Sequence, residues 1–97
     1  MKYTEIEFDE HNIYKNEVEH NVCYWEIEEC FENVFVVLKN KKRGKHKNRR
    51  VVLGRTNAGR YLFLVVLEKG GGLIRPISAR DMSDAERKYY VKQTKNR

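Results

Sequence analysis

The sequence has no apolar run long enough to cross a membrane, and its 97 residues include only two cysteines and one proline. Its longest apolar stretch, residues 61–67, falls well short of the roughly 18–20 residues that a membrane-spanning helix needs. The N-terminal segment is acidic, whereas a signal peptide begins with basic and then apolar residues. We therefore expect one cytoplasmic domain over residues 1–97 that makes no contact with a membrane.

The two cysteines, Cys23 and Cys30, do not form a disulfide or a metal site by their spacing. On one helix their Cα atoms would be about 10.5 Å apart, beyond the limit of about 7 Å for a disulfide. Neither belongs to a CxxC pair, so no zinc or other metal site is expected. Walker, GxGxxG, HExxH and GxSxG motifs are also absent from the sequence, which leaves no support for a nucleotide, dinucleotide or other cofactor.

The net charge of +6 hides a strong asymmetry between the two parts of the chain. Residues 1–32 carry ten acids and two bases (−8), whereas residues 33–97 carry eighteen bases and four acids (+14). The densest run is a predicted basic loop at about 39–50, which includes Lys45, Lys47, Arg49 and Arg50. Such a run attracts a polyanion, above all the phosphates of nucleic acid. The alternatives are a solvated loop and a surface for an acidic protein.

The hydrophobic pattern predicts an α+β fold with two N-terminal helices, a four-stranded antiparallel sheet and a C-terminal helix. We expect helices at about 10–20, 24–32 and 83–92, strands at 34–38, 49–55, 61–67 and 73–80, and a frayed tail after residue 92. Asp9 is the expected cap of the first helix. Pro76 cannot donate a hydrogen bond to a neighbouring strand, so the last strand should lie at an edge or contain a bulge. Helices mainly on one face leave the other face free to bind a partner.

Arg75 and Arg80 lie near the end of the last predicted strand, which positions a side chain better than a flexible tail does. Positioned cations typically meet phosphate or carboxylate. RNA supplies its own nucleophile, the 2′-hydroxyl. A small protein can therefore cleave RNA by orienting that hydroxyl and neutralising the charge on the phosphorane.

Arginine is not deprotonated in proteins, so proton transfer would fall to His20, Glu86, Tyr90 or a lysine. His20 follows Asn16 by four residues and shares its helix face, although a histidine at a helix end also caps the last carbonyls. Glu86 completes a capping box with Ser83, which by itself would explain its presence.

Together these motifs resemble the BrnT family of ribonuclease toxins from bacterial type II toxin–antitoxin systems, over roughly residues 8–90. The closing element is the most specific of three shared elements. The matching residues are Phe8, Asp9, Asn16, His20 and Val22 in the first element, Arg49, Gly54, Gly59 and Arg60 in the second, and Arg75, Ile77, Ser78, Ala79, Arg80, Glu86 and Tyr90 in the third.

The resemblance implies a compact RelE-like domain that cleaves RNA and halts translation. The positioned arginines and the lack of a metal-ligand motif in the sequence lead us to expect cleavage without a metal or cofactor. The resemblance also implies a BrnA-like antitoxin that neutralises the toxin and itself contacts operator DNA. We expect the toxin–antitoxin complex to be of higher order than 1:1. The resemblance implies a basic site built from Arg49, Arg60, Arg75 and Arg80, with His20, Glu86 and Tyr90 as helpers. We assign catalysis to Arg49, Arg75 and Arg80 with these helpers, and RNA binding to Arg60 together with Lys45, Lys47 and Arg50 of the basic run.

A second interpretation is a non-catalytic basic module that binds nucleic acid or an acidic protein. It is favoured by the apolar pair Val66-Leu67, which stands where the family often has polar residues late in the central strand.

Overall fold

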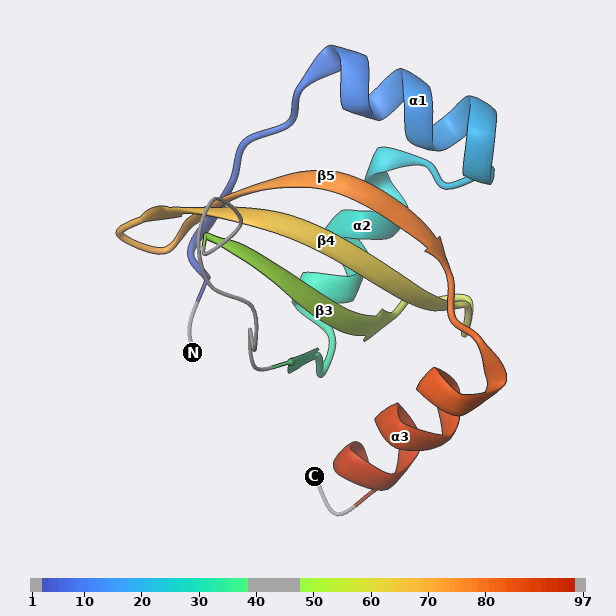
Figure 1. Cartoon of the computed structure of the whole chain (residues 1–97). Coiled ribbons are helices and arrows are strands. Elements are labelled where there is room, and N and C mark those ends of the chain that lie inside the picture. The colour runs from blue at the N-terminus through green and yellow to red at the C-terminus, as the bar shows by residue number, and fades with distance from the viewer. Residues whose placement is uncertain (1–2, 39–47, 96–97) are drawn as a thin grey trace.

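The computed structural model describes residues 3–38 and 48–95, and these form an α+β domain in which three helices surround a curled five-stranded sheet (Figure 1). The elements are β1 (Glu5–Ile6), α1 (Glu10–His20), α2 (Tyr24–Glu32), β2 (Val36–Val37), β3 (Arg49–Arg55), β4 (Tyr61–Gly70), β5 (Leu73–Asp81) and α3 (Asp84–Thr94). The predicted basic loop between β2 and β3, with Lys45 and Lys47, lies outside the described residues.

The strand order is β1-β5-β4-β3-β2, and β1 is parallel to β5 while the other neighbours are antiparallel. The expectation of four antiparallel strands in a RelE-like domain was therefore wrong in detail. β1 was missed because it has only two residues, one of them a glutamate, and forms through a distant pairing with Leu73 and Ile74. β2 is also shorter than predicted.

Local sequence signals set the helix ends. The Asp9 carboxylate accepts hydrogen bonds from the backbone N–H groups of His11 (2.8 Å) and Asn12 (3.3 Å), which confirms the predicted cap of α1. Ser83 and Glu86 form the predicted capping box of α3. That helix continues to Thr94, past the predicted end at residue 92, and the Thr94 hydroxyl donates to the Tyr90 carbonyl (2.9 Å).

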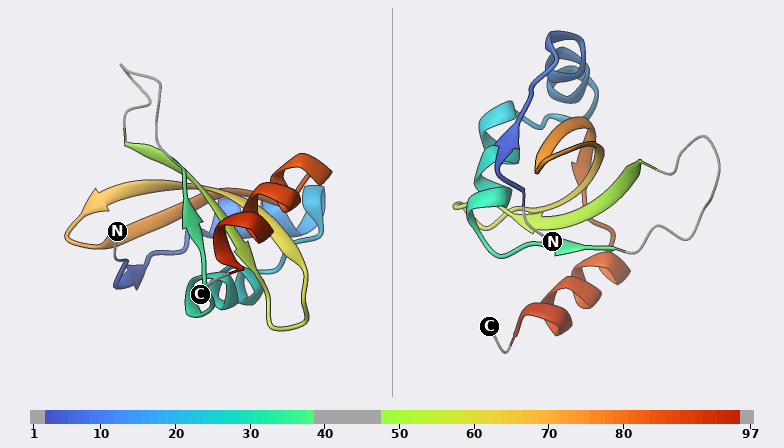
Figure 2. Two further views of the ribbon diagram at one scale, coloured as in Figure 1. Left: turned by 90° about the horizontal axis from the view of Figure 1, so that it is seen from below. Right: turned by 90° about the vertical axis from the view of Figure 1, so that its left-hand side faces the viewer.

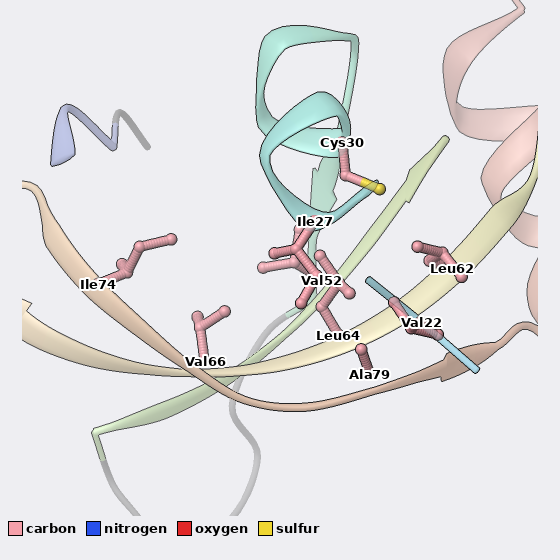
Figure 3. Packing of buried hydrophobic residues seen from close by; sticks show 9 residues of the cluster. All are labelled: Val22, Ile27, Cys30, Val52, Leu62, Leu64, Val66, Ile74 and Ala79. Carbon is pink, nitrogen blue, oxygen red and sulfur yellow. The ribbon is translucent and has the colours of Figure 1, made fainter. Parts of the chain in front are cut away.

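The hydrophobic core lies between α2 and one face of the sheet (Figure 3). Its buried residues are Val22, Ile27, Cys30, Val52, Leu62, Leu64, Val66, Ile74 and Ala79. Gly54 lets α2 approach β3 closely, since a Cβ atom at this position would lie 2.7 Å from the Cβ atom of Cys30. The approach of α2 to the sheet thus depends on one glycine.

α1 lies along the free edge of β5 and hydrogen-bonds the strand through its side chains. Asn16 is buried, and its Oδ1 atom accepts from the backbone N–H of Ala79 (3.2 Å). The Lys15 ammonium donates to the carbonyl of Ile77 (2.8 Å). Both contacts satisfy backbone groups that have no strand partner at this edge.

α3 lies on the opposite side of the sheet from α2 and covers only one end of it (Figures 1 and 2). The Tyr90 hydroxyl donates to the Val34 carbonyl (2.6 Å), and the Tyr90 ring packs edge-on against Tyr61 at 5.8 Å. The remaining part of this sheet face carries no helix in the described chain. Among those residues, no helix is long and apolar enough to cross a membrane.

Candidate nucleic-acid interface

The sheet face opposite α2, which we call the open face, has an apolar floor framed by arginines. We assign residues to the open face from the strand pairing, because side chains alternate between the two faces of a sheet and paired residues share a face. The floor residues are Val51 and Leu53 of β3, Tyr61, Phe63, Val65 and Leu67 of β4, and Ser78 of β5. The framing arginines are Arg49 and Arg55 of β3 and Arg75 and Arg80 of β5.

A β-bulge brings Arg75 and Arg80 to the same face. In a regular strand, residues five apart point to opposite faces. Here Val65 pairs with Ser78 and Val66 pairs with Pro76, so Ile77 is an extra residue that shifts the alternation by one. The bulge predicted near Pro76 is thereby confirmed, and its consequence is that both arginines join the open face.

Arg80 is held from two directions. Its guanidinium donates to both carboxylate oxygens of Glu86 (2.9 and 3.0 Å) and to the Asp81 carbonyl (2.9 Å). It also lies over the Phe63 ring, 3.8 Å from the ring centroid. A guanidinium fixed by a forked ion pair and an aromatic face is oriented in advance for an anion.

The Glu86 side chain is consequently ionised and restricted in its conformation. Hydrogen bonds from Arg80, and then from Ser83, hold the pKa of its carboxyl below the ordinary glutamate range despite partial burial. A carboxylate of this kind is a weak base, because a lowered pKa disfavours proton uptake. Its contacts place it as the residue that orients Arg80.

Arg75 is held at the other end of the open face. Its guanidinium contacts the Glu7 carboxylate through Nε (2.9 Å) and Nη2 (2.8 Å), and its Nη1 lies 3.6 Å from Asp9. Lys69 shares the same Glu7 oxygen at 3.0 Å. Hydrogen bonds from Lys69 and Arg75 lower the pKa of Glu7.

The guanidinium groups of Arg75 and Arg80 are too far apart to bind one phosphate together. Arg75 pairs with Leu67 and Arg80 pairs with Phe63, so they are separated by four residues of β4, or about 13 Å. Their carboxylate partners draw the guanidinium groups away from each other, toward β1 and α3 respectively. Arg49 also pairs with Leu67, which puts it in the Arg75 row, about 9.6 Å across the sheet. The arginines thus form two cationic ends of one surface.

Arg60 is not brought to this surface. Its guanidinium donates to Asp81 (2.7 Å), to Glu26 (3.1 Å) and to the backbone carbonyl of Asn21 (2.7 Å), all on the helix side. Hydrogen bonding to Asp81, followed by Glu26, raises the pKa of this arginine. Arg60 therefore ties the segment between α1 and α2 to the ends of β4 and β5.

Two further predicted residues, Arg50 and His20, lie off the open face, whereas Tyr90 packs on the Tyr61 ring at the α3 end of that face. Arg50 pairs with Val66 on the helix side and approaches Glu68 at 3.5 Å. The Tyr90 hydroxyl is bonded to Val34, and burial raises the pKa of this tyrosine. His20 ends α1 at the β5 edge, where its carbonyl accepts from Arg60 (3.4 Å).

Three residues that no sequence motif singled out cluster at the α3 end of the open face. Arg55 and Arg87 both lie over the Tyr61 ring, at 5.3 and 4.5 Å from its centroid. Arg55 and Tyr61 are a cross-strand pair beside the turn that joins β3 to β4, while Arg87 comes from α3. The only signal available beforehand was the expected register across that turn. In the described part of the chain, no three His, Cys, Asp or Glu side chains are grouped so as to hold a metal ion.

A small α+β domain with fixed arginines around an apolar sheet face that α3 covers only at one end has the arrangement of a polyanion-binding module. The comparison with protein families makes this specific. The chain belongs to the BrnT family, since the model of the ribonuclease toxin BrnT of type II toxin–antitoxin systems matches residues 8–86. Membership of this family implies an antitoxin as partner.

The fold is also similar to a solved structure, the 1.1 Å crystal structure of the Brucella abortus ribonuclease toxin BrnT. The TM-score is 0.63 at 19% sequence identity, and the match covers 84% of this chain and 99% of that chain. At this identity the likeness concerns the fold. No curated protein matches the sequence.

Proposed function

We propose that this chain is a metal-independent endoribonuclease that cleaves RNA, halts translation and is neutralised by a BrnA-like antitoxin. The observation that carries the proposal is the bulge at Ile77, which turns Arg75 and Arg80 onto the open face, where each is fixed by a carboxylate. This arrangement supports cleavage by positioning and electrostatics, the two contributions that arginine can make.

In the proposed reaction, the RNA 2′-hydroxyl loses its proton and its oxygen attacks the adjacent phosphorus. The bond from phosphorus to the 5′-oxygen breaks, and that oxygen takes up a proton. The products are a 2′,3′-cyclic phosphate and a 5′-hydroxyl. Arg80 neutralises the charge that accumulates on the phosphorane, because its guanidinium is already oriented by Glu86 and Phe63.

The separation of the two cationic ends assigns different tasks to the arginines. We place the scissile phosphate at Arg80, where aromatic rings and further cations converge. Arg75 and Arg49 then bind backbone phosphates further along the strand. Lys45 and Lys47, which lie outside the described residues, are also proposed to contact RNA, whereas Arg50 lies on the helix side of the sheet and is not assigned to this path. This division follows from the distance of about 13 Å along β4.

For proton transfer we propose His20. Asn16 fixes α1 beside Ala79, and the His20 carbonyl is tied through Arg60 to Asp81, so His20 lies at the same end of β5 as Arg80. Glu86 orients Arg80, and Tyr90 anchors α3. If His20 carries the proton, His20→Gln should lower the single-turnover rate constant of cleavage far more than it lowers the affinity for RNA.

The antitoxin is expected to cover the open face with an acidic or amphipathic segment, because this neutralises the arginines and excludes RNA. In this arrangement operator DNA is contacted by the antitoxin, and the complex contains more than one copy of each chain. Protection of Arg75 and Arg80 from arginine-modifying reagents in the complex checks this, and full reactivity of both would place the antitoxin elsewhere.

A non-catalytic binding module is the second candidate. Of the apolar pair Val66-Leu67 that favours it in the sequence, Val66 is buried in the core, while Leu67 lies on the floor of the open face. The test is incubation of the purified chain with labelled single-stranded RNA and with ribosome-bound message, both in EDTA. Cyclic phosphate ends that disappear in Arg80→Gln would support the enzyme. Cleavage that needs added metal would contradict metal independence, and no cleavage by folded protein would favour the binding module. Growth arrest by the wild type but not by Arg80→Gln would link the activity to toxicity.

A further inference from the structure

We infer that Arg55, Tyr61 and Arg87 form a second subsite on the open face, which holds a nucleotide next to the scissile phosphate at Arg80. Arg55 and Arg87 bind its phosphate, and the base stacks against the exposed arginine–tyrosine surface. This inference rests on the proposed action on RNA, and it assigns residues that lie outside the motifs resembling the BrnT family.

The cluster places two positive charges, those of Arg55 and Arg87, on the Tyr61 ring. Arg60, Arg75 and Arg80 each have a carboxylate partner within 3.1 Å. Arg55 and Arg87 are both exposed and form no ion pair within residues 3–38 and 48–95. Two like charges gathered on one ring repel each other, and an anion between them would remove the repulsion.

The Tyr61 ring is held in a position that suits base stacking. Tyr61 is only partly buried, and its edge-on contact with Tyr90 fixes it against α3. Guanidinium planes and aromatic rings are the surfaces on which nucleobases stack in single-stranded RNA complexes. A fixed tyrosine flanked by two arginines presents both kinds of surface at one point.

The cluster at Tyr61 lies next to Arg80 on the open face. Tyr61 and Phe63 are two residues apart on the same face of β4, or about 6.6 Å. Arg80 lies over Phe63, while Arg55 and Arg87 lie over Tyr61. Successive phosphates of an extended single strand have a similar spacing, so one strand can contact both positions with neighbouring nucleotides.

The test is binding of a fluorescent single-stranded RNA whose riboses carry 2′-O-methyl groups, which prevents cleavage. The Arg55→Gln/Arg87→Gln double variant is compared with Lys88→Gln/Lys92→Gln, which removes the same two charges from exposed positions of α3. Circular dichroism confirms that both variants are folded. Fluorescence anisotropy over a salt series then gives the affinity and its salt dependence.

We expect the arginine double variant to bind at least tenfold more weakly than the lysine control. Its slope of log affinity against log salt should fall by about 1.4, which corresponds to two lost phosphate contacts on a single strand. A Tyr61→Leu variant should lose affinity without a change in that slope. Equal behaviour of the two double variants would overturn the subsite, as would wild type that fails to bind the RNA.

The outcomes separate this inference from the proposed function. If wild type cleaves RNA and the two double variants bind alike, the subsite is wrong and the ribonuclease stands. If wild type binds but does not cleave, and the arginine variant alone loses affinity, the subsite stands as part of a binding module.

Discussion

Removing the charge of Glu86 should destabilise the domain through the loss of its ion pair with Arg80. Glu86→Gln keeps an amide oxygen that can accept from the Ser83 N–H, as glutamine does in capping boxes, but removes the charge facing Arg80. The pair is forked but partly exposed, with 24% of the Glu86 side chain and 41% of the Arg80 side chain accessible. We therefore expect a loss of about 0.5–1 kcal/mol, which corresponds to about 2–8 °C in melting temperature for a domain of this size.

The pH dependence of this loss tests its cause. The folded-state pKa of Glu86 is lowered, so its contribution to the free energy of unfolding is complete above the ordinary glutamate pKa and disappears as pH falls through the folded value. The difference in melting temperature between wild type and Glu86→Gln should be largest near pH 7 and vanish in strong acid. Glu28→Gln, an exposed change on α2, is the matched control and should stay within about 0.5 kcal/mol of wild type. A difference that is constant with pH would refute the assigned ion pair.

Three other predictions concern the scaffold. Gly54→Ala should lower the free energy of unfolding by about 1–3 kcal/mol in a denaturant titration, because the new Cβ meets the Cβ atom of Cys30. Adding Cys30→Ala to this variant should not restore stability. Arg60→Gln should cost about 1.5–3 kcal/mol by the same measurement, since it breaks charged hydrogen bonds to Asp81, while RNA affinity of the folded variant stays within about threefold; a larger loss of affinity would return Arg60 to the RNA site. Burial raises the pKa of the Cys30 thiol to about 12, so its labelling by a thiol reagent at pH 8 should follow global unfolding, whereas prompt labelling would contradict that burial.

Local signals in the sequence predicted most elements of the fold. The cap at Asp9, the capping box at Ser83 and the apolar content of residues 61–67 act over a few residues, and α1, α2, β4 and α3 appear close to where they were expected. The failures concern distant pairing. β1 is held by distant contacts such as the hydrogen bond from the backbone N–H of Thr4 to the carbonyl of Gly72 (2.9 Å), and glycine permits this approach because a Cβ atom at residue 72 would lie 2.5 Å from the Thr4 hydroxyl oxygen. Such a pairing leaves almost no local pattern.

The site was predictable only in part, because it too depends on pairing between distant residues. Pro76 indicated a bulge, but only the register shows that the extra residue is Ile77 and that it turns Arg75 and Arg80 to one face. Arg60 and Tyr90 had the right chemistry for an RNA site, yet their partners Asp81 and Val34 are brought in by tertiary packing. Residue type predicted the chemistry, whereas alternation along the strands decided which residues share a surface.

The central claim is that Arg80 acts on the scissile phosphate while Arg75 binds the strand. Single-turnover cleavage of labelled RNA in EDTA, with the binding constant measured in parallel on 2′-O-methyl RNA, tests it most directly. The account predicts that Arg80→Gln lowers the rate constant by about 100-fold or more, the effect of removing a preorganised charge-stabilising group, with a change in affinity below tenfold. Arg75→Gln should mainly weaken binding. An Arg80→Gln variant that cleaves bound RNA at the wild-type rate would contradict the account.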